Sequence, residues 1–232
     1  VLRSDLGAWP LVDSNDRMVG VITVDDVLDV VEEEATEDIL KLAGVGVKER
    51  ALSPVSESAR RRLPWLVVNL AAALIASFVV SLFEETIAQV AALAAIMPIV
   101  AGQGGNAGVQ TATIVVRGLA LEEIDTGDIL RVLWKELLLG VVKGTLFGGA
   151  LMLITYSWLG DGNTTMALVA GSAMFCNMIV ASLGGVLIPI TLRYVRKVDP
   201  ATAAGVFDTM LTDIMGFFVF LGLATLFLSQ LD

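Results

Sequence analysis

The sequence predicts an all-α polytopic membrane protein with five transmembrane helices, preceded by a partial α/β domain and a connecting helix. Hydrophobic residues make up 56% of the 232 residues, and the mean hydropathy is +0.79, whereas soluble domains are about 45–50% apolar. Five long apolar segments occupy residues 63–232, and each is near the roughly 20 residues that cross a bilayer. The residues before them instead have the mixed polar and apolar pattern of a soluble protein.

Residues 1–28 are predicted to be the end of a larger α/β domain. Residues 9–12 and 18–23 are rich in strand-forming side chains and flank a polar turn at residues 13–16. Thr23 precedes an expected helix, and Asp26 three positions later completes a capping box with a carboxylate. Because the chain begins with Val1 in the middle of this pattern, we expect it to be a fragment of a longer protein.

Residues 29–62 are predicted to form an acidic connecting helix and a linker to the membrane. Eight carboxylates lie close together where this helix begins: Asp25, Asp26, Asp29, Glu32, Glu33, Glu34, Glu37 and Asp38. A solvated acidic face and a surface for a hard cation explain this run equally well, since carboxylate oxygens suit Mg²⁺ and Ca²⁺.

Basic residues set the orientation of the membrane segments, which we expect at residues 64–83, 87–116, 137–159, 166–192 and from residue 200 onward. After residue 59, every Lys and Arg precedes segment one, lies between segment two and the first two turns of segment three, or lies between segments four and five. The positive-inside rule therefore predicts a multi-pass protein of the cell membrane with a cytoplasmic N-terminus and an outside C-terminus.

Asp213 lies in the middle of the last segment. Asp199 and Pro200 are typical of a helix start, and about 1.5 Å per residue places Asp213 about 20 Å further, near the centre of the bilayer. A carboxylate there costs at least roughly 2.5–3.5 kcal/mol. It is therefore predicted to serve an ion or proton site, with a bond to a neighbouring helix as the alternative. Thr209 and Gly216 share its face.

The second segment is interrupted by four glycines, two glutamines and an asparagine between Gly102 and Gln110. Pro98 and the glycines permit unwinding, and non-helical backbone at membrane depth is tolerated where it lines water or is buried in protein. Helix packing through small residues accounts for the glycines but less well for the amides. The stretch therefore predicts a pore or site lining formed by Gln103, Gly104, Gly105, Asn106 and Ala107, with Asn177 in a weaker version in segment four.

Two further features of the membrane segments have structural interpretations. Gly140, Gly144 and Gly148 recur at four-residue spacing, which predicts a helix-packing face. Asp208 lies about 140° around its helix from Asp213. It either lines a vestibule or pairs with Lys143 or an arginine, and the sequence does not decide between these.

Composition excludes several classes of function. The chain has no His and a single Cys, so it has no histidine base, no imidazole metal ligand and no internal disulfide. No nucleophile elbow, phosphate loop or zinc spacing is present, and we expect no enzymatic activity. The net charge of −10 disfavours nucleic acid and agrees with a cation partner.

Taken together, these motifs resemble the MgtE family of magnesium channels and transporters. Residues 11–31, with the run at residues 20–26, are similar to the last part of the family's second CBS domain, and residues 29–42, with the run at residues 34–39, are similar to its plug helix. The remaining matching motifs are the run at residues 102–112, Asn177 with Gly184, Gly185 and Pro189, and the stretch from Asp199 to Asp213.

The resemblance implies a homodimer whose pore lies on the two-fold axis, lined by the second and fifth membrane helices. Asp213 would hold a hydrated Mg²⁺ with Asn106 beside it. Cytosolic Mg²⁺ would close the gate by binding the acidic residues that match the CBS and plug region: Asp25, Asp29, Glu33, Glu34, Glu37, Asp38 and Asp199. Membrane lipid is the other expected partner. Glu84 and Glu85 are either cation-concentrating charges at the outer mouth or ordinary interfacial charges.

The chain also departs from the family pattern. Val206 and Met210 stand where relatives often have Pro and Thr, and Asp208 where they often have an apolar residue. Three alternative functions share most features: a transporter for Co²⁺ or another divalent ion, a proton- or Na⁺-coupled exchanger that uses Asp213, and a non-transporting membrane Mg²⁺ sensor. The interrupted second segment argues against the sensor.

Overall fold

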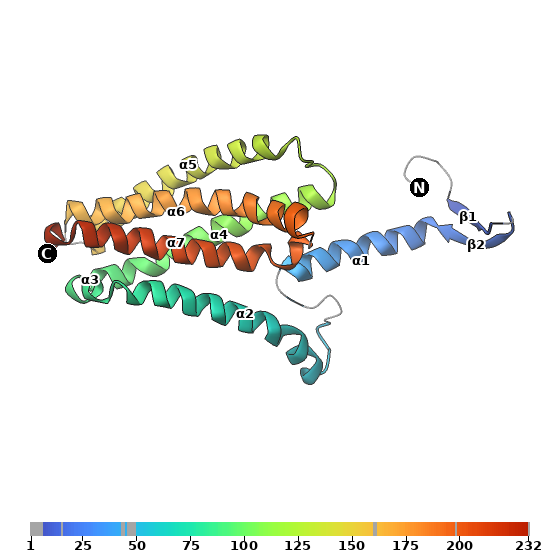
Figure 1. The fold of residues 1–232 in the computed structure, drawn as a ribbon, viewed down its shortest axis with the longest axis horizontal. Coiled ribbons are helices and arrows are strands. Elements are labelled where there is room, and N and C mark those ends of the chain that lie inside the picture. Colours follow the sequence, from blue (N-terminus) through green and yellow to red (C-terminus); the bar gives the residue numbers. More distant parts are fainter. Residues whose placement is uncertain are drawn as a thin grey trace.

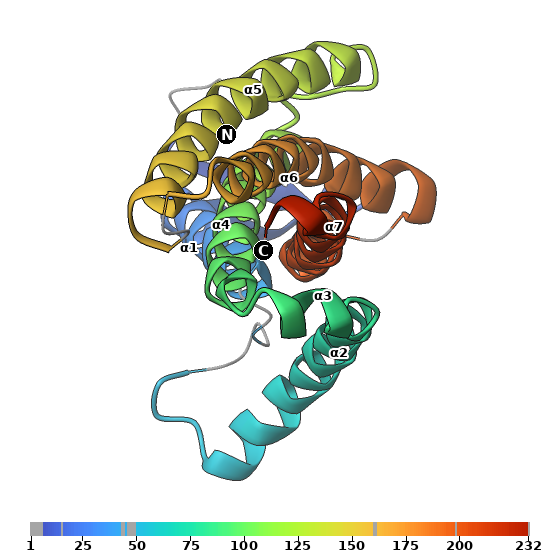
Figure 2. The ribbon, with the colours of Figure 1, turned by 90° about the vertical axis from the view of Figure 1, so that its left-hand side faces the viewer.

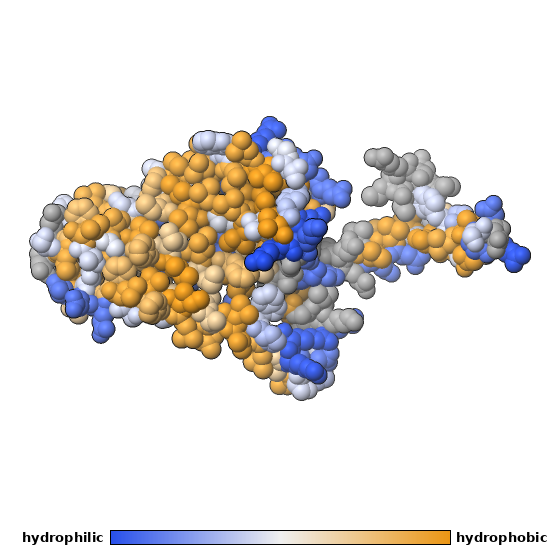
Figure 3. Space-filling view, viewed as in Figure 1, coloured by the Kyte–Doolittle hydropathy of each residue, from blue (hydrophilic) through white to orange (hydrophobic). Residues whose placement is uncertain are grey.

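Five helices long and apolar enough to cross a membrane dominate the computed structural model, which describes residues 7–14, 16–42, 45, 50–159, 162–197 and 199–231. They are α2 (Val55–Ser81), α4 (Ala92–Ala120), α5 (Ile129–Ile154), α6 (Thr164–Ile190) and α7 (Ala204–Leu226). They form one bundle with an apolar flank and polar ends (Figure 1, Figure 3). The predicted fold class, five membrane helices after a small α/β segment, is confirmed.

The bundle has a centre and two outlying helices. Viewed along its length, α4, α6 and α7 lie together, α5 covers the outer side of α6, and α2 lies on the other side of α7 (Figure 2). The short helix α3 (Glu84–Gln89) links α2 to α4. Short segments end or begin the long helices: η1 (Thr155–Leu159), η2 (Thr191–Arg196), η3 (Pro200–Thr202) and η4 (Leu228–Gln230).

A two-stranded hairpin and a long helix precede the bundle. Strands β1 (Ala8–Val12) and β2 (Met18–Thr23) pair antiparallel where the sequence predicts strands, and α1 (Val24–Leu42) follows directly. The capping box is formed: Thr23 N donates to Asp26 Oδ2 at 2.8 Å, and Asp26 N donates to Thr23 Oγ1 at 3.3 Å. These bonds from Thr23 hold the pKa of Asp26 below its usual value. Helix α1 extends away from the bundle and carries the hairpin at its far end (Figure 1).

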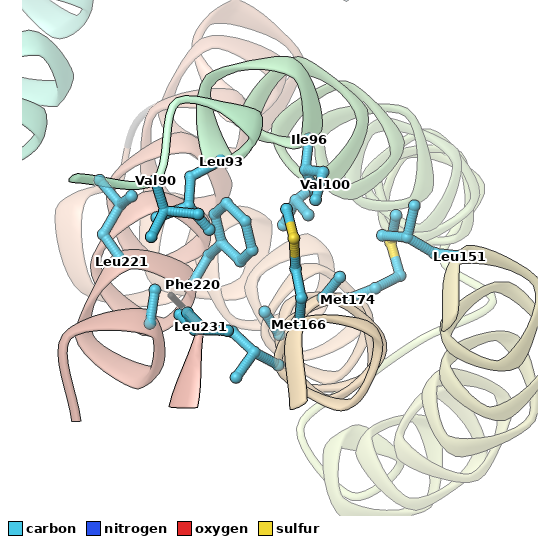
Figure 4. Close-up of a cluster of buried hydrophobic side chains, with 14 of the residues drawn as sticks. Val90, Leu93, Ile96, Val100, Leu151, Met166, Met174, Phe220, Leu221 and Leu231 are labelled. Atoms are coloured by element: carbon cyan, nitrogen blue, oxygen red, sulfur yellow. The ribbon is translucent and has the colours of Figure 1, made fainter. Parts of the chain in front are cut away.

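The largest hydrophobic core joins α4, α6 and α7. Leu93 and Ile96 of α4, Met174 of α6, and Phe220 and Leu221 of α7 are almost completely buried and pack together (Figure 4). Close packing of this kind resists changes of volume. The core therefore fixes α4 and α7 side by side, which matters because both carry the polar groups described below.

The predicted packing face of α5 is confirmed. Gly140, Gly144 and Gly148 are buried against α6. A Cβ atom added at Gly144 would lie 2.9 Å from Phe175 Cδ2, and one at Gly148 would lie 2.7 Å from the Gly171 carbonyl oxygen. Real Cβ atoms do not approach so closely, so only glycine permits this helix spacing.

The expectation that segment two unwinds is wrong. Helix α4 runs without interruption from Ala92 to Ala120, through Pro98 and all four glycines. Gly104, Gly105 and Gly108 are buried there because other helices approach α4 closely. Tight packing through small residues therefore keeps this stretch helical, and tertiary contacts outweigh the low helix propensity of glycine. Segment two also starts later than expected, because residues 87–89 belong to α3.

Candidate functional site

A polar groove of about 540 Å³ lies between α4 and α7. Seven of its wall residues come from one face of α4, and Thr209 and Asp213 come from α7: Ala101, Gly102, Gln103, Gly105, Asn106, Val109, Gln110, Thr209 and Asp213. The structure thus brings together the predicted residues Gln103, Gly105, Asn106, Thr209 and Asp213. Asp213 is the one acidic residue among the groove's wall residues that the structure describes.

Helical spacing explains why these side chains share one face. Gln103, Asn106 and Gln110 follow one another at intervals of three and four residues on α4, and Asp213 follows Thr209 by four residues on α7. Asn106 and both glutamines are exposed in this chain, and Asp213 is half-buried. The Thr209 hydroxyl donates to the Gly205 carbonyl at 2.9 Å, so its oxygen lone pairs stay available to the groove.

A second cavity of about 350 Å³ adjoins the groove and also reaches Asp213. Val109, Thr209 and Asp213 belong to both walls, and α2 adds Asn69, Ala72 and Ala73. Sequence reasoning missed Asn69, because segment one was treated as uniformly apolar. The signal that would have found it is the one used for Asn106, an amide in the middle of a membrane segment.

Four predicted lining residues lie outside the groove wall: Gly104, Ala107, Asn177 and Gly216, which are all buried. Asn177 is 1% exposed, and its Nδ2 donates to the Val100 carbonyl of α4 at 2.9 Å. Cβ atoms added at Gly104 and Gly216 would lie 2.2 Å and 2.8 Å from the same Nδ2. The Asn177 side chain therefore fills the space between these two glycines and ties α6 to α4 and α7 behind the groove. Its position inside the bundle departs from the expected lining role.

At the end of the bundle next to α1, one lysine joins two of the predicted regulatory carboxylates. Lys41 Nζ lies 2.5 Å from Glu37 Oε1 and 2.6 Å from Asp199 Oδ2. The hydrogen bonds to Asp199 and then to Glu37 raise the pKa of Lys41. Burial alone would raise the pKa of Asp199, but the bonds from Lys41 and from Ala201 N outweigh it, so this pKa lies below its usual value. Helix α1 is therefore attached to the start of the segment that leads into α7.

The other predicted regulatory residues are distributed along α1. Asp25 and Asp29 are exposed near its beginning. Glu33, Glu34 and Asp38 fall within the α1 range, but their side chains lie outside the described part of the chain. The structure thus pairs Glu37 with Asp199 through Lys41 and leaves Asp25 and Asp29 apart from that pair.

Glu84 and Glu85 occupy the first turn of α3 and are exposed. Helix α3 lies at the end of the bundle opposite α1 (Figure 1). Both carboxylates are thus at the end that the basic residues assign to the outside.

The groove suits a hydrated cation better than a bare one. Mg²⁺ prefers six oxygens in octahedral geometry and loses its waters reluctantly. Within the described part of the chain, no group of three or more His, Cys, Asp or Glu side chains is placed to hold a metal. One carboxylate, three amides and a hydroxyl can instead accept hydrogen bonds from an ion's water shell.

Comparisons with known proteins find a matching family model and similar curated relatives. The model of the MgtE family, described as divalent cation transporter, matches residues 97–223. The chain is 38% identical over 229 residues to magnesium transporter MgtE of Bacillus subtilis, covering 99% of this chain and 50% of the relative. It is 37% identical over 227 residues to the protein of the same name from Thermus thermophilus, covering 97% and 50%. The chain thus spans about half the length of these curated relatives.

Proposed function

Because the chain belongs to the MgtE family of divalent cation transporters, we propose that it forms the membrane part of a Mg²⁺-selective channel or transporter. One observation carries the proposal. A single carboxylate, Asp213, faces a groove whose other polar wall groups are amides and a hydroxyl. Such a wall attracts a cation and contacts its water shell without removing it. Both relatives named above are magnesium transporters.

The second part of the proposal concerns how the groove becomes a pore. In a single chain, the groove beside Asp213 is open on one side. We infer that a second copy of the chain closes it, with α4 and α7 of both copies arranged around a two-fold axis. A symmetric dimer places the same patch on both sides, so two Asp213 carboxylates would face one ion. Their combined charge favours a divalent over a monovalent guest.

The third part concerns gating by cytosolic Mg²⁺. The carboxylates of Glu37 and Asp199 converge on one cationic group, the Lys41 ammonium. We propose that cytosolic Mg²⁺ acts on these carboxylates and on the other acidic residues of α1, and that the attachment of α1 beside α7 transmits this to the inner mouth. A ligand shifts such an equilibrium only through a difference in affinity between two states. The N-terminus is proposed to be cytoplasmic, in agreement with the basic residues at the α1 end.

The test is Mg²⁺ uptake into proteoliposomes that contain the full-length protein and an internal Mg²⁺ indicator. Asp213→Ala should abolish uptake while the protein stays folded and dimeric, because it removes the carboxylate of the groove. Glu123→Gln, on an exposed turn, is the matched control and should transport normally. Normal uptake by a well-folded Asp213→Ala protein would refute the proposal.

The same vesicles separate the competing functions. Uptake of Co²⁺ in preference to Mg²⁺ indicates a transporter for another divalent ion. Uptake that requires a proton or Na⁺ gradient indicates an exchanger. Failure of the unmodified protein to move any divalent ion, together with Mg²⁺ binding to its acidic helix, indicates a sensor.

A further inference from the structure

Asp208 lies on the side of α7 that faces the bundle, away from the groove. Its side chain is completely buried, with 0% exposure. A Cβ atom added at Gly108 of α4 would lie 1.6 Å from Asp208 Oδ2, and one at Gly184 of α6 would lie 2.7 Å from Oδ1. The carboxyl group therefore occupies the space that these two glycines leave free, and it does not line a vestibule.

Neither oxygen of this carboxyl group has a hydrogen-bond partner among the residues that the structure describes. The basic group facing it is Lys143 of α5, which is half-buried and interacts electrostatically with both Asp208 and Glu136. Glu136 has partners of its own, because Thr111 Oγ1 donates to it at 3.2 Å and Lys135 Nζ lies 3.2 Å away. Helices α4 and α6 meet Asp208 through the uncharged Gly108 and Gly184.

A buried carboxylate without hydrogen bonds is among the most unfavourable groups in a membrane protein, and such groups usually become neutral. A metal ion requires several oxygens, and the described residues around Asp208 offer no group of three acidic side chains. A proton requires only the carboxyl oxygen itself. We propose that Asp208 is a proton-binding site, a carboxylic acid that is neutral at neutral pH and is enclosed by α4, α6 and α7.

Because Asp208 lies near Asp213, loss of the Asp208 proton would affect ion transport. This step rests on the proposed function of Asp213. Asp208 and Asp213 are five residues apart on α7, which corresponds to about 7.5 Å along the helix axis. Loss of the proton would add a negative charge behind an ion held at Asp213. Ionised Asp208 would therefore strengthen cation binding at Asp213 and slow cation release.

Infrared spectroscopy tests the proton directly, because a neutral carboxyl group has a C=O stretching band separate from that of a carboxylate. The sample is the full-length protein in lipid at neutral pH, compared with Asp208→Asn, which keeps the shape of the side chain. We expect a protonated-carboxyl band that Asp208→Asn removes and Glu136→Gln, a buried neighbouring control, retains. A spectrum that Asp208→Asn leaves unchanged would overturn the proposal.

A second variant distinguishes the proton from an ion pair with Lys143 and guards against misfolding of the first. In Lys143→Met the band should persist and should need a higher pH for its loss. If Asp208 is instead ionised and paired with Lys143, the band will be absent from the unmodified protein and will appear only in Lys143→Met, which also overturns the proposal. The Asp208 band should be retained in Asp213→Ala even if that variant transports normally, so this result is independent of the proposed function.

Discussion

Helix α7 carries two carboxylates in opposite settings. Asp213 is half-buried and faces a groove of about 540 Å³ with amide side chains on the opposite wall. Asp208 is completely buried against two glycines, with no hydrogen-bond partner among the described residues. Five residues of one helix thus separate a group placed to meet ions from a group closed off from them.

The neighbouring helix α4 produces this difference. At the level of Asp213 it presents Gln103 and Asn106, whose side chains form a polar wall. At the level of Asp208 it presents Gly108, which brings the α4 backbone against the carboxyl group. The role of an acidic residue in a membrane helix is therefore decided by the helices packed on each side of it, and the following substitutions alter one side at a time.

After Asp213 itself, the largest effect on transport is expected on the groove side, at Asn106. Asn106→Leu should lower Mg²⁺ uptake at least tenfold, about 1.4 kcal/mol, because it replaces an amide that accepts hydrogen bonds from the ion's waters with an apolar group. Asn106→Ala should keep a larger share of the uptake, since it leaves room for water. Uptake by Asn106→Leu at the unmodified rate would show that this wall only packs helices.

The largest effect on stability is expected on the closed side, at Gly108. Gly108→Ala should destabilise the protein by about 1–3 kcal/mol, the usual cost of overpacking, because the new methyl group would lie 1.6 Å from Asp208 Oδ2. Gly102→Ala is the matched control on the same helix, because nothing lies within 4 Å of its added Cβ atom. It should be neutral or stabilising by up to about 1 kcal/mol. Thermal unfolding in detergent measures both, and equal midpoints would contradict the enclosed position of Asp208.

A smaller effect is expected at Asn69, which extends the polar wall to α2. Asn69→Leu should reduce Mg²⁺ uptake a few-fold, or about 0.5–1 kcal/mol, because its amide reaches the cavity that includes Asp213. Ser77→Leu, eight positions later on α2 and outside that cavity, should have no effect on uptake. Equal losses in both variants would mean that α2 responds to added bulk and not to a lost amide.

The smallest effect is expected where α1 meets the start of α7. Lys41→Met should lower the free energy of unfolding by only about 0.2–1 kcal/mol, because the ion pair with Asp199 is partly exposed to solvent. Because the pKa of Asp199 is lowered, its contribution to the free energy of unfolding is present at neutral pH and is lost on acidification. Because the pKa of Lys41 is raised, the contribution of Lys41 is lost only in strong alkali. Thermal unfolding from neutral to acidic pH should show this loss in the unmodified protein and a smaller loss in Lys41→Met, which keeps the bond from Ala201 N to Asp199.

The features that the sequence predicted well are those set by residues close together along the chain. The number of membrane helices, the hairpin, the Thr23–Asp26 cap and the glycine face of α5 all follow from local pattern. The depth of Asp213 in its segment also follows from counting residues, and its neighbours Gln103 and Asn106 were found because amides are rare in apolar segments.

The features that the sequence did not predict depend on which helices become neighbours. Unwinding near Gly104 was expected from propensity, but Asn177 of α6 fills the space beside it and the helix stays intact. The Lys41–Asp199 contact joins residues 158 positions apart. The setting of Asp208 could not be predicted for the same reason, because it needs the positions of Gly108 and Gly184 together.

The central claim is that Asp213, and not Asp208, faces the transported ion. Its most direct test is Mg²⁺ uptake by Asp213→Asn and Asp208→Asn, measured side by side in proteoliposomes at neutral pH. Each change removes one potential negative charge from α7 and keeps the side-chain shape. Asp213→Asn should lose nearly all Mg²⁺ uptake and most of its selectivity for divalent ions, whereas Asp208→Asn should lose far less. Equal losses in the two variants, or a greater loss in Asp208→Asn, would contradict the account.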